Sequence, residues 1–265
     1  MIEVVALAKQ FVAPQPRGLS FKQVPPRVVK AVRQVSFVAP DGHITGLLGP
    51  NGAGKTTTLR MLAALIAPDA GRMAVDGIDV ASRPREALAR MGMLSDARGL
   101  YPRLTARENI VYYGLLQGMD REAASARAET LARMLEMRPL LDRRTDGFSQ
   151  GERMKTALAR SLVHDPPNIV LDEPTNGLDV LATRALREAL RFLRTPEGGG
   201  KCIVFSTHIM QEVQRLCDSV VVVSHGRSVA SGTVDELLAQ TAERDFEEAF
   251  VKLAFAEERA QGATS

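Results

Sequence analysis

The sequence predicts an α/β fold with a parallel sheet, because strand and helix signals alternate along much of the chain. Each strand signal is a short apolar run bounded by turn residues, and each helical signal spaces its apolar residues three and four positions apart. The strand signals are 44–48, 168–171, 202–206 and 220–223, and the helical signals are 56–66, 181–193 and 209–216. Such alternation is typical of a parallel sheet whose ligands collect where its strands end.

The N-terminal region predicts an antiparallel β subdomain beside this sheet. Residues 1–48 read as short strands with turns, and 35–38 is the best strand candidate apart from 44–48. An irregular loop over 13–26 contains four prolines. Its cations fit a solvated loop better than a contact with acidic lipid or a partner.

Two helical regions complete the predicted organisation. Residues 83–163 read as a helical insertion, and 233–256 as a helical segment that packs one apolar face against the domain. That face consists of Phe246, Ala249, Phe250 and Leu253. We predict one domain over 1–230, with the insertion at about 83–163, and a C-terminal helical tail over 231–265.

Composition excludes several classes of protein. The 265 residues are 45% hydrophobic and 25% charged, which suits a globular α/β domain. A net charge of +3 gives no reason to expect nucleic-acid binding. The two cysteines form no C-x-x-C pair, which argues against zinc or a disulfide framework. No run of about 18 apolar residues predicts a membrane span, and the N-terminus does not resemble a secretory signal.

A glycine-rich turn between the first apolar strand and its helix predicts a phosphate site. Residues 49–56, Gly-Pro-Asn-Gly-Ala-Gly-Lys-Thr, fit the pattern G-x-x-x-x-G-K-[ST] of a P-loop. Its backbone N–H groups and the helix N-terminus suit a polyphosphate. We expect Lys55 to reach the terminal phosphates and Thr56 to offer its hydroxyl to Mg²⁺.

Two acidic residues end the strand at 168–171. Asp172 is placed to hold Mg²⁺, mostly through water, and Glu173 to polarise an attacking water as a general base. Paired acids at a strand end are often only a helix cap, but a P-loop needs such a partner.

A second predicted anion site begins a helix that runs from about 153 to 163. Ser149 and Gly151 lie in the segment Phe-Ser-Gln-Gly-Glu at 148–152. Alone, this segment is more often a helix cap than a phosphate site. Two phosphate-binding helix starts in one chain indicate a dimer that shares its nucleotides.

These motifs resemble those of ABC transporter nucleotide-binding subunits over about residues 1–230. Five motifs follow the family's order: Walker A at 49–56, the LSGGQ-like signature at 148–152, Walker B with its glutamate at 169–173, the D-loop at 176–179, and the switch histidine at 206–208. The resemblance implies a P-loop NTPase with a RecA-like sheet core.

The resemblance also implies an ATPase that uses ATP and Mg²⁺. Two subunits pair head to tail, and the pair works beneath an integral membrane permease on the cytoplasmic face of the membrane. The expected catalytic residues are Lys55, Glu173 and His208, and the expected metal ligands are Thr56, Asp96 and Asp172. The expected nucleotide-binding residues are Phe11, Gly49, Pro50, Asn51, Gly52, Ala53, Gly54, Lys55, Thr56, Thr57, Ser149, Gln150, Gly151 and Asp179.

Two of these assignments depart from the usual pattern. Phe11 is expected to stack on adenine, although Phe21 competes because the proline-rich loop separates Phe11 from the next strand. Asp96 occupies a position where the family normally has Gln. Because carboxylate can still serve Mg²⁺, we predict retained hydrolysis with altered coupling or metal dependence.

The segment 96–109, the signature and residues 246–250 resemble bacterial export ATPases, a subgroup that includes the sodium-exporting ABC subunit. Export is therefore expected, with sodium as a candidate cargo. Two alternatives are a soluble ABC-fold ATPase that acts on a macromolecule and a regulatory cassette that does not hydrolyse ATP. The chain lacks the Asn-Lys-x-Asp of a GTPase, and a kinase would not need the Ser149 motif.

Overall fold

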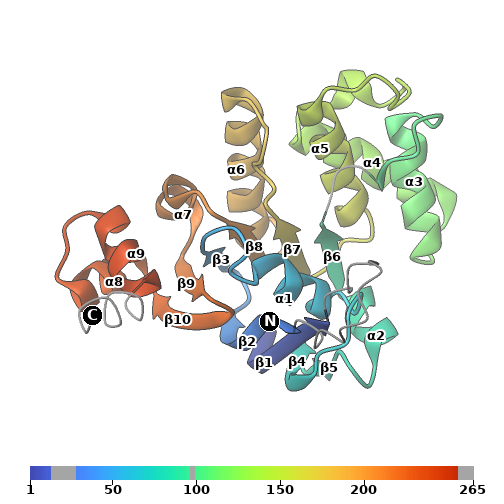
Figure 1. Cartoon of the computed structure of the whole chain (residues 1–265). Helices are drawn as coiled ribbons and strands as arrows, with labels where there is room; N and C mark the ends of the chain where they lie inside the picture. Colours follow the sequence, from blue (N-terminus) through green and yellow to red (C-terminus); the bar gives the residue numbers. More distant parts are fainter. Residues whose placement is uncertain (13–27, 96–98, 256–265) are drawn as a thin grey trace, which may run out of the picture.

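The computed structural model describes residues 1–12, 28–95 and 99–255. The described residues contain one ten-stranded sheet of order β5-β4-β1-β2-β10-β9-β3-β8-β7-β6 (Figure 1). Its strands are β1 (Ile2–Val12), β2 (Val28–Ala39), β3 (Ile44–Leu48), β4 (Ala70–Val75), β5 (Ile78–Asp79), β6 (Met91–Leu94), β7 (Asn168–Asp172), β8 (Cys202–Thr207), β9 (Ser219–Ser224) and β10 (Arg227–Gly232).

Nine α-helices and a short 3-10 helix accompany the sheet in the described part of the chain. They are α1 (Lys55–Leu62), α2 (Pro84–Ala89), α3 (Ala106–Leu116), α4 (Arg121–Met134), η2 (Arg138–Leu140), α5 (Gln150–Leu162), α6 (Val180–Arg194), α7 (Met210–Leu216), α8 (Val234–Thr241) and α9 (Phe246–Ala254).

The predicted parallel sheet is present as five neighbouring strands, β9, β3, β8, β7 and β6. Every residue of β3 and β8 is buried, as expected of strands covered on both faces. Strand β6 lies inside the region that the sequence assigns to helices, because its four residues give too short a signal. The helix predicted over 56–66 ends earlier, at Leu62.

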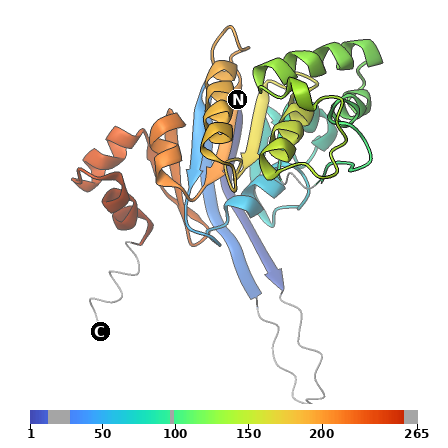
Figure 2. The ribbon, with the colours of Figure 1, turned by 90° about the horizontal axis from the view of Figure 1, so that it is seen from above.

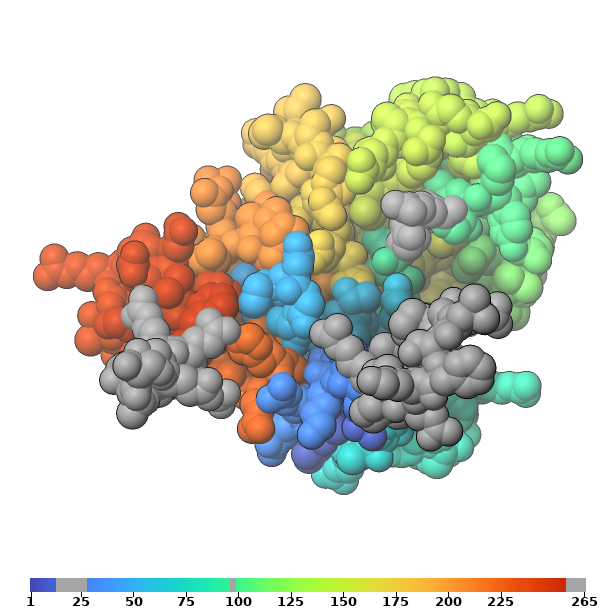
Figure 3. All heavy atoms as spheres, viewed as in Figure 1, coloured from blue at the N-terminus to red at the C-terminus, as the bar shows by residue number. Residues whose placement is uncertain are grey.

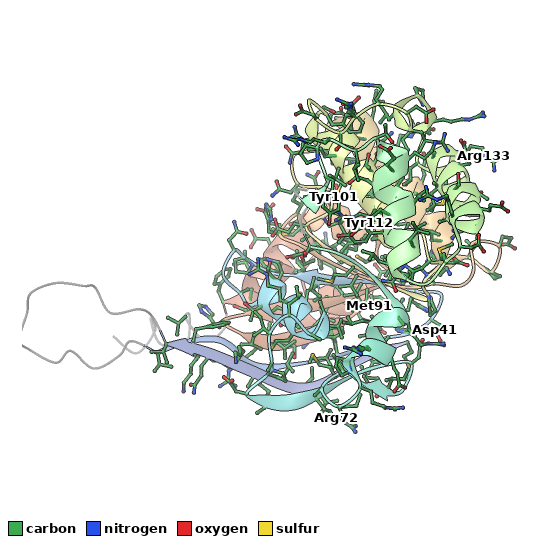
Figure 4. All side chains as sticks on the ribbon, turned by 90° about the vertical axis from the view of Figure 1, so that its right-hand side faces the viewer. Asp41, Arg72, Met91, Tyr101, Tyr112 and Arg133 are labelled. Atoms are coloured by element: carbon green, nitrogen blue, oxygen red, sulfur yellow. The ribbon has the colours of Figure 1, made fainter. Side chains whose placement is uncertain are left out.

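The antiparallel part consists of β1, β2, β4 and β5. The prediction of short strands was wrong here, since β1 and β2 have 11 and 12 residues. Exposed and buried residues mix along both strands, so apolar runs underestimate their length. Their Val12 and Val28 ends continue past the other strands (Figures 2 and 4).

The helices α3, α4 and α5 pack together at one side of the molecule (Figure 1). Thr105 and Ser149 each begin a helix with a capping box, and Asp120 caps α4. On this part, Tyr101 and Tyr112 meet edge to face with ring centroids 5.5 Å apart, and Figure 4 labels both.

The C-terminal segment forms two helices rather than one. Helix α8 ends at Thr241, the left-handed conformation of the following Ala242 turns the chain, and Asp245 caps α9. Phe246, Ala249 and Phe250 are buried in a cluster with β9, which confirms their predicted packing, while Leu253 is partly buried beside them. Among the described residues, no helix is long and apolar enough to cross a membrane.

Candidate nucleotide site

The P-loop joins β3 to α1 near the middle of the molecule, between the helical part and the C-terminal helices (Figures 1 and 3). Two of its glycines are required by their surroundings. A Cβ on Gly49 would lie 2.1 Å from the carbonyl oxygen of Val223, and a Cβ on Gly54 would lie 2.6 Å from that of Ala31. Gly54 also has a φ of 104°, which other residues rarely adopt.

The turn between β9 and β10 supports the P-loop through backbone hydrogen bonds. The N–H of Gly226 donates to the carbonyl of Ala53 at 3.0 Å. The carbonyl of Gly226 accepts from the N–H groups of Arg33 and Gln34 at 2.7 and 2.9 Å. This single turn therefore fixes the loop to β2. Sequence reasoning missed Gly226, since its contacts are made through the backbone and leave no motif.

Lys55 lies beneath the loop with only 4% of its side chain exposed. Its ammonium group donates to the carbonyls of Gly49 and Pro50 at 2.7 and 3.1 Å. Burial lowers its pKa, although the charges of Glu173 and Asp172 oppose this shift. Its Nζ lies 3.9 Å from Oε1 of Glu173, so the structure brings these two predicted catalytic groups together.

The predicted metal ligands Thr56 and Asp172 are in contact. Oδ1 of Asp172 accepts a hydrogen bond from Thr56 Oγ1 at 3.1 Å and a second from Ser206 Oγ at 2.5 Å. Ser206 is fully buried and pairs with Asp172 across β8 and β7. This contact was not predicted, because the sequence shows Ser206 only as the first residue of the segment 206–208 that contains the switch histidine. Thr57 is half-buried at the start of α1.

Glu173 directly follows β7 and has three further polar neighbours besides Lys55. Its Oε1 is 3.3 Å from Nδ1 of His208, and its Oε2 accepts from Nδ2 of Asn176 at 3.5 Å. Its backbone N–H donates to Oγ of Ser206 at 3.0 Å. Its φ of 47° places this non-glycine residue in the left-handed region. Backbone strain of this kind is common where a catalytic side chain must be aimed.

The predicted signature residues lie apart from the P-loop, at the N-terminus of α5 (Figure 1). The hydroxyl of Ser149 accepts from the N–H of Glu152 at 3.2 Å, so the helix-cap interpretation is correct for this residue. The helix begins at Gln150 instead of near 153, which places Gln150 and Gly151 in its first turn.

The signature and the D-loop are joined. Nε2 of Gln150 donates to the carbonyl of Asn176 at 2.9 Å. Asp179 caps α6 by accepting from the N–H of Ala182 at 2.8 Å. The segment that carries Asp179 therefore links Glu173 to the start of α5.

Phe11 lies on β1 opposite Val29, with 39% of its surface exposed. The ammonium of Lys9 is 5.7 Å from its ring centroid. Val29 is two residues from Ala31, which touches the P-loop, so Phe11 belongs to the strand pair beside the phosphate site. Asp96 and Phe21 lie outside the described residues.

The donor set fits a nucleoside triphosphate and a hard cation. A glycine cradle with no room for a Cβ at Gly49, a buried ammonium, and a hydroxyl next to a carboxylate are the groups that bind phosphate and Mg²⁺. Glu173 and His208 add a candidate base and a directional imidazole. Together with the parallel sheet, these groups define a P-loop NTPase.

Comparison with known proteins identifies the family. The family model described as ABC transporter matches residues 32–176. The ABC transporter ATP-binding protein NatA of Bacillus subtilis strain 168 is 44% identical over 226 residues, which are 85% of this chain and 91% of that protein. The Nod factor export ATP-binding protein I of Burkholderia lata is 42% identical over 207 residues, 78% of this chain and 67% of that protein.

Solved structures agree with this result. An ATP-binding subunit of an ABC transporter superposes with a TM-score of 0.79 at 29% identity, covering 95% of this chain and 98% of that one. The dimeric ABC transporter cassette MJ0796, with a TM-score of 0.75 at 24% identity over 88% of this chain and 98% of that one, supports the fold alone. The chain belongs to the ABC transporter family as an ATP-binding, ATP-hydrolysing subunit.

Proposed function

We propose that this ATPase subunit powers export through separate membrane permease subunits, by ATP-driven closure of two cassettes. The observation that carries the proposal is the separation of the two phosphate-binding helix starts. Lys55 and Thr56 begin α1, whereas Ser149 caps α5 beside the D-loop. A facing copy in head-to-tail arrangement supplies the second helix start to each nucleotide. MJ0796, a relative in fold, is a dimer.

Each half of the proposed site has its own residues. In one copy the loop from Gly49 to Thr57 holds the phosphates, Lys55 pairs with the terminal ones, and Phe11 stacks on adenine. Thr56 and Asp172 hold Mg²⁺, which neutralises phosphate charge when bound, and Asp96 is proposed to contribute. The facing copy contributes the residues of its signature and D-loop: Ser149, Gln150, Gly151 and Asp179.

Glu173 acts on the attacking water in this proposal. Its carboxylate accepts a proton from water, and His208 at 3.3 Å orients that carboxylate and contacts the γ-phosphate. Asn176 donates a hydrogen bond to the other carboxylate oxygen of Glu173, and the carbonyl of Asn176 accepts one from Gln150. The base is therefore coupled by hydrogen bonds to the signature helix of its own subunit.

The direction of transport and the cargo are proposed from the relatives of this chain. Export is supported by the relatives whose names include Nod factor export. Sodium is proposed from the resemblance of the segments 96–109 and 246–250 to the sodium-exporting subgroup. An ATP-binding subunit does not touch cargo, so the permease determines which substrate is exported. We place the subunit on the cytoplasmic face of the cell membrane, held there by that permease.

Glu173→Gln tests the proposed ATP hydrolysis and dimer closure. The variant is expected to bind ATP, lose turnover, and accumulate as an ATP-dependent dimer measured by light scattering. Glu86→Gln is the matched control, because the side chain of Glu86 is 59% exposed on α2, where it pairs with the exposed Arg83. Full turnover in Glu173→Gln, or a monomer in the presence of ATP and the natural permease, would refute the proposal.

The cargo needs a separate experiment. Membrane proteins that co-purify with the subunit identify the permease. Inside-out vesicles with that permease and the subunit are expected to accumulate ²²Na⁺ on addition of ATP, and vesicles with Glu173→Gln are not. ATP turnover in the complex without ²²Na⁺ uptake would exclude sodium and leave the ATPase proposal intact.

A further inference from the structure

We propose that Ser206 is a positioning residue for ATP hydrolysis, whose hydroxyl fixes both the metal-binding Asp172 and the base Glu173. The inference rests on the proposed roles of these two carboxylates. Ser206 opens the segment 206–208 that contains the switch histidine, but it is not among the residues expected to touch nucleotide or metal.

Parallel strand pairing brings Ser206 to this place. Strands β7 and β8 pair with Asp172 opposite Ser206, which are the last residue of β7 and the last but one of β8. Ser206 is 0% exposed, so water does not compete for its hydroxyl. A buried hydroxyl needs hydrogen-bond partners, and this one has two.

The first partner is the carboxylate of Asp172. Ser206 Oγ donates to Oδ1 at 2.5 Å, the short distance expected for a hydroxyl on a charged acceptor. Thr56 donates to the same oxygen at 3.1 Å, but its hydroxyl is also the proposed metal ligand. The hydroxyl of Ser206 is not a proposed metal ligand. It therefore fixes the carboxylate orientation and leaves Oδ2 free for the metal and its waters.

The second partner is the backbone of Glu173. Its N–H donates to Ser206 Oγ at 3.0 Å and also approaches the Ser206 carbonyl at 3.2 Å. Glu173 has a φ of 47°, a conformation that costs a non-glycine residue about 1–2 kcal/mol. The hydrogen bond to Oγ therefore favours the strained conformation that aims Glu173 at His208 and Lys55.

The neighbouring hydroxyl has a different environment. Successive strand residues point to opposite faces, and Thr207 Oγ1 accepts from the N–H of Ile209 at 3.0 Å. One hydroxyl of the Ser-Thr-His segment thus holds the start of the following turn, while the other holds the carboxylates. The pair cannot exchange roles, because a one-residue shift would move Ser206 to the wrong face.

Ser206→Ala tests the inference, since it removes one oxygen and introduces no clash. We expect the affinity of the ATP-loaded protein for Mn²⁺, measured by electron paramagnetic resonance, to fall about tenfold or more. The value of kcat should fall by a similar factor, while binding of ATP without metal stays unchanged. Ser206→Thr keeps a hydroxyl and should recover most of the Mn²⁺ affinity.

Thr45→Val is the matched control. Thr45 is also 0% exposed in the parallel sheet, and its hydroxyl contacts Ser219 Oγ at 3.2 Å, away from the carboxylates. Its loss should reduce the free energy of unfolding without changing Mn²⁺ affinity. If Ser206→Ala keeps wild-type Mn²⁺ affinity and kcat, or behaves as Thr45→Val does, Ser206 has no positioning role. Full turnover in both Glu173→Gln and Lys55→Met would instead overturn the proposed function.

Discussion

Gly49→Ala is expected to disrupt the P-loop through one contact. The added Cβ would lie 2.1 Å from the carbonyl oxygen of Val223, whereas ordinary contacts between carbon and oxygen begin at about 3.3 Å. The loop or β9 must therefore move by about 1.2 Å. Overpacking of this kind costs about 1–3 kcal/mol. The movement also weakens the bond from Gly49 N–H to the Thr207 carbonyl, worth about 1 kcal/mol.

Gly52→Ala provides the comparison within the same loop. Apart from its chain neighbours, no atom of the described residues lies within 4 Å of a Cβ placed on Gly52, so its φ of 81° opposes alanine, at about 1–2 kcal/mol. Urea unfolding followed by circular dichroism suits a chain without tryptophan. We expect Gly49→Ala to lose about 2–4 kcal/mol and most ATP affinity by calorimetry. Wild-type stability in Gly49→Ala, or a larger loss in Gly52→Ala, would refute the steric reasoning.

Three further changes test the charges of the fold and site. Burial lowers the folded-state pKa of Lys55, so folding releases a proton at pH values between that lowered pKa and 10.5. Within this window the wild-type protein should gain stability with rising pH through Lys55, and Lys55→Met, which also loses turnover, should lack that gain. Although partial burial raises the pKa of Asp76, hydrogen bonds led by one from the terminal amine lower it below 3.8. Asp76→Asn should lose about 1–3 kcal/mol at neutral pH, a difference that fades as acid protonates the wild-type carboxyl in unfolding titrations. Arg187→Leu leaves Glu212 buried without its bidentate partner and should cost about 3 kcal/mol, while the same change at the exposed Arg184 should cost under about 1.

Local patterns predicted the parts of the fold that bury continuous apolar runs. The strand before the P-loop and the strand before Asp172 are buried over four or five residues, so hydrophobicity alone located them. Local patterns did not predict the length of β1 and β2, because the stability of this strand pair comes from pairing between distant residues. The same reasoning applies to β6, where four residues pair with β7 inside a helical region.

The candidate site was predictable wherever a side chain carries the chemistry. Lys55, Thr56, Asp172, Glu173 and His208 were each expected, and the structure brings them into contact. Residues that act through the backbone or through strand register left no comparable signal. Gly226 supports the loop with backbone atoms alone, and Ser206 reaches Asp172 only because two strands align in one register.

The shared site is the central claim, and mixed dimers test it most directly. Lys55→Met disables the P-loop half, and Ser149→Asp places a negative charge where the facing phosphate would bind. Aspartate caps a helix as well as serine does, so α5 should remain folded. Each variant alone should lack ATP-dependent pairing and turnover.

The decisive measurement is ATP turnover after the two variants are mixed in equal amounts. In a head-to-tail pair, every mixed dimer has one site with both defects and one site with none. Because neither variant pairs with itself, the mixture should restore up to about half of the wild-type rate if the sites act independently. A mixture no more active than its separate components would contradict a nucleotide site built from two copies of this chain.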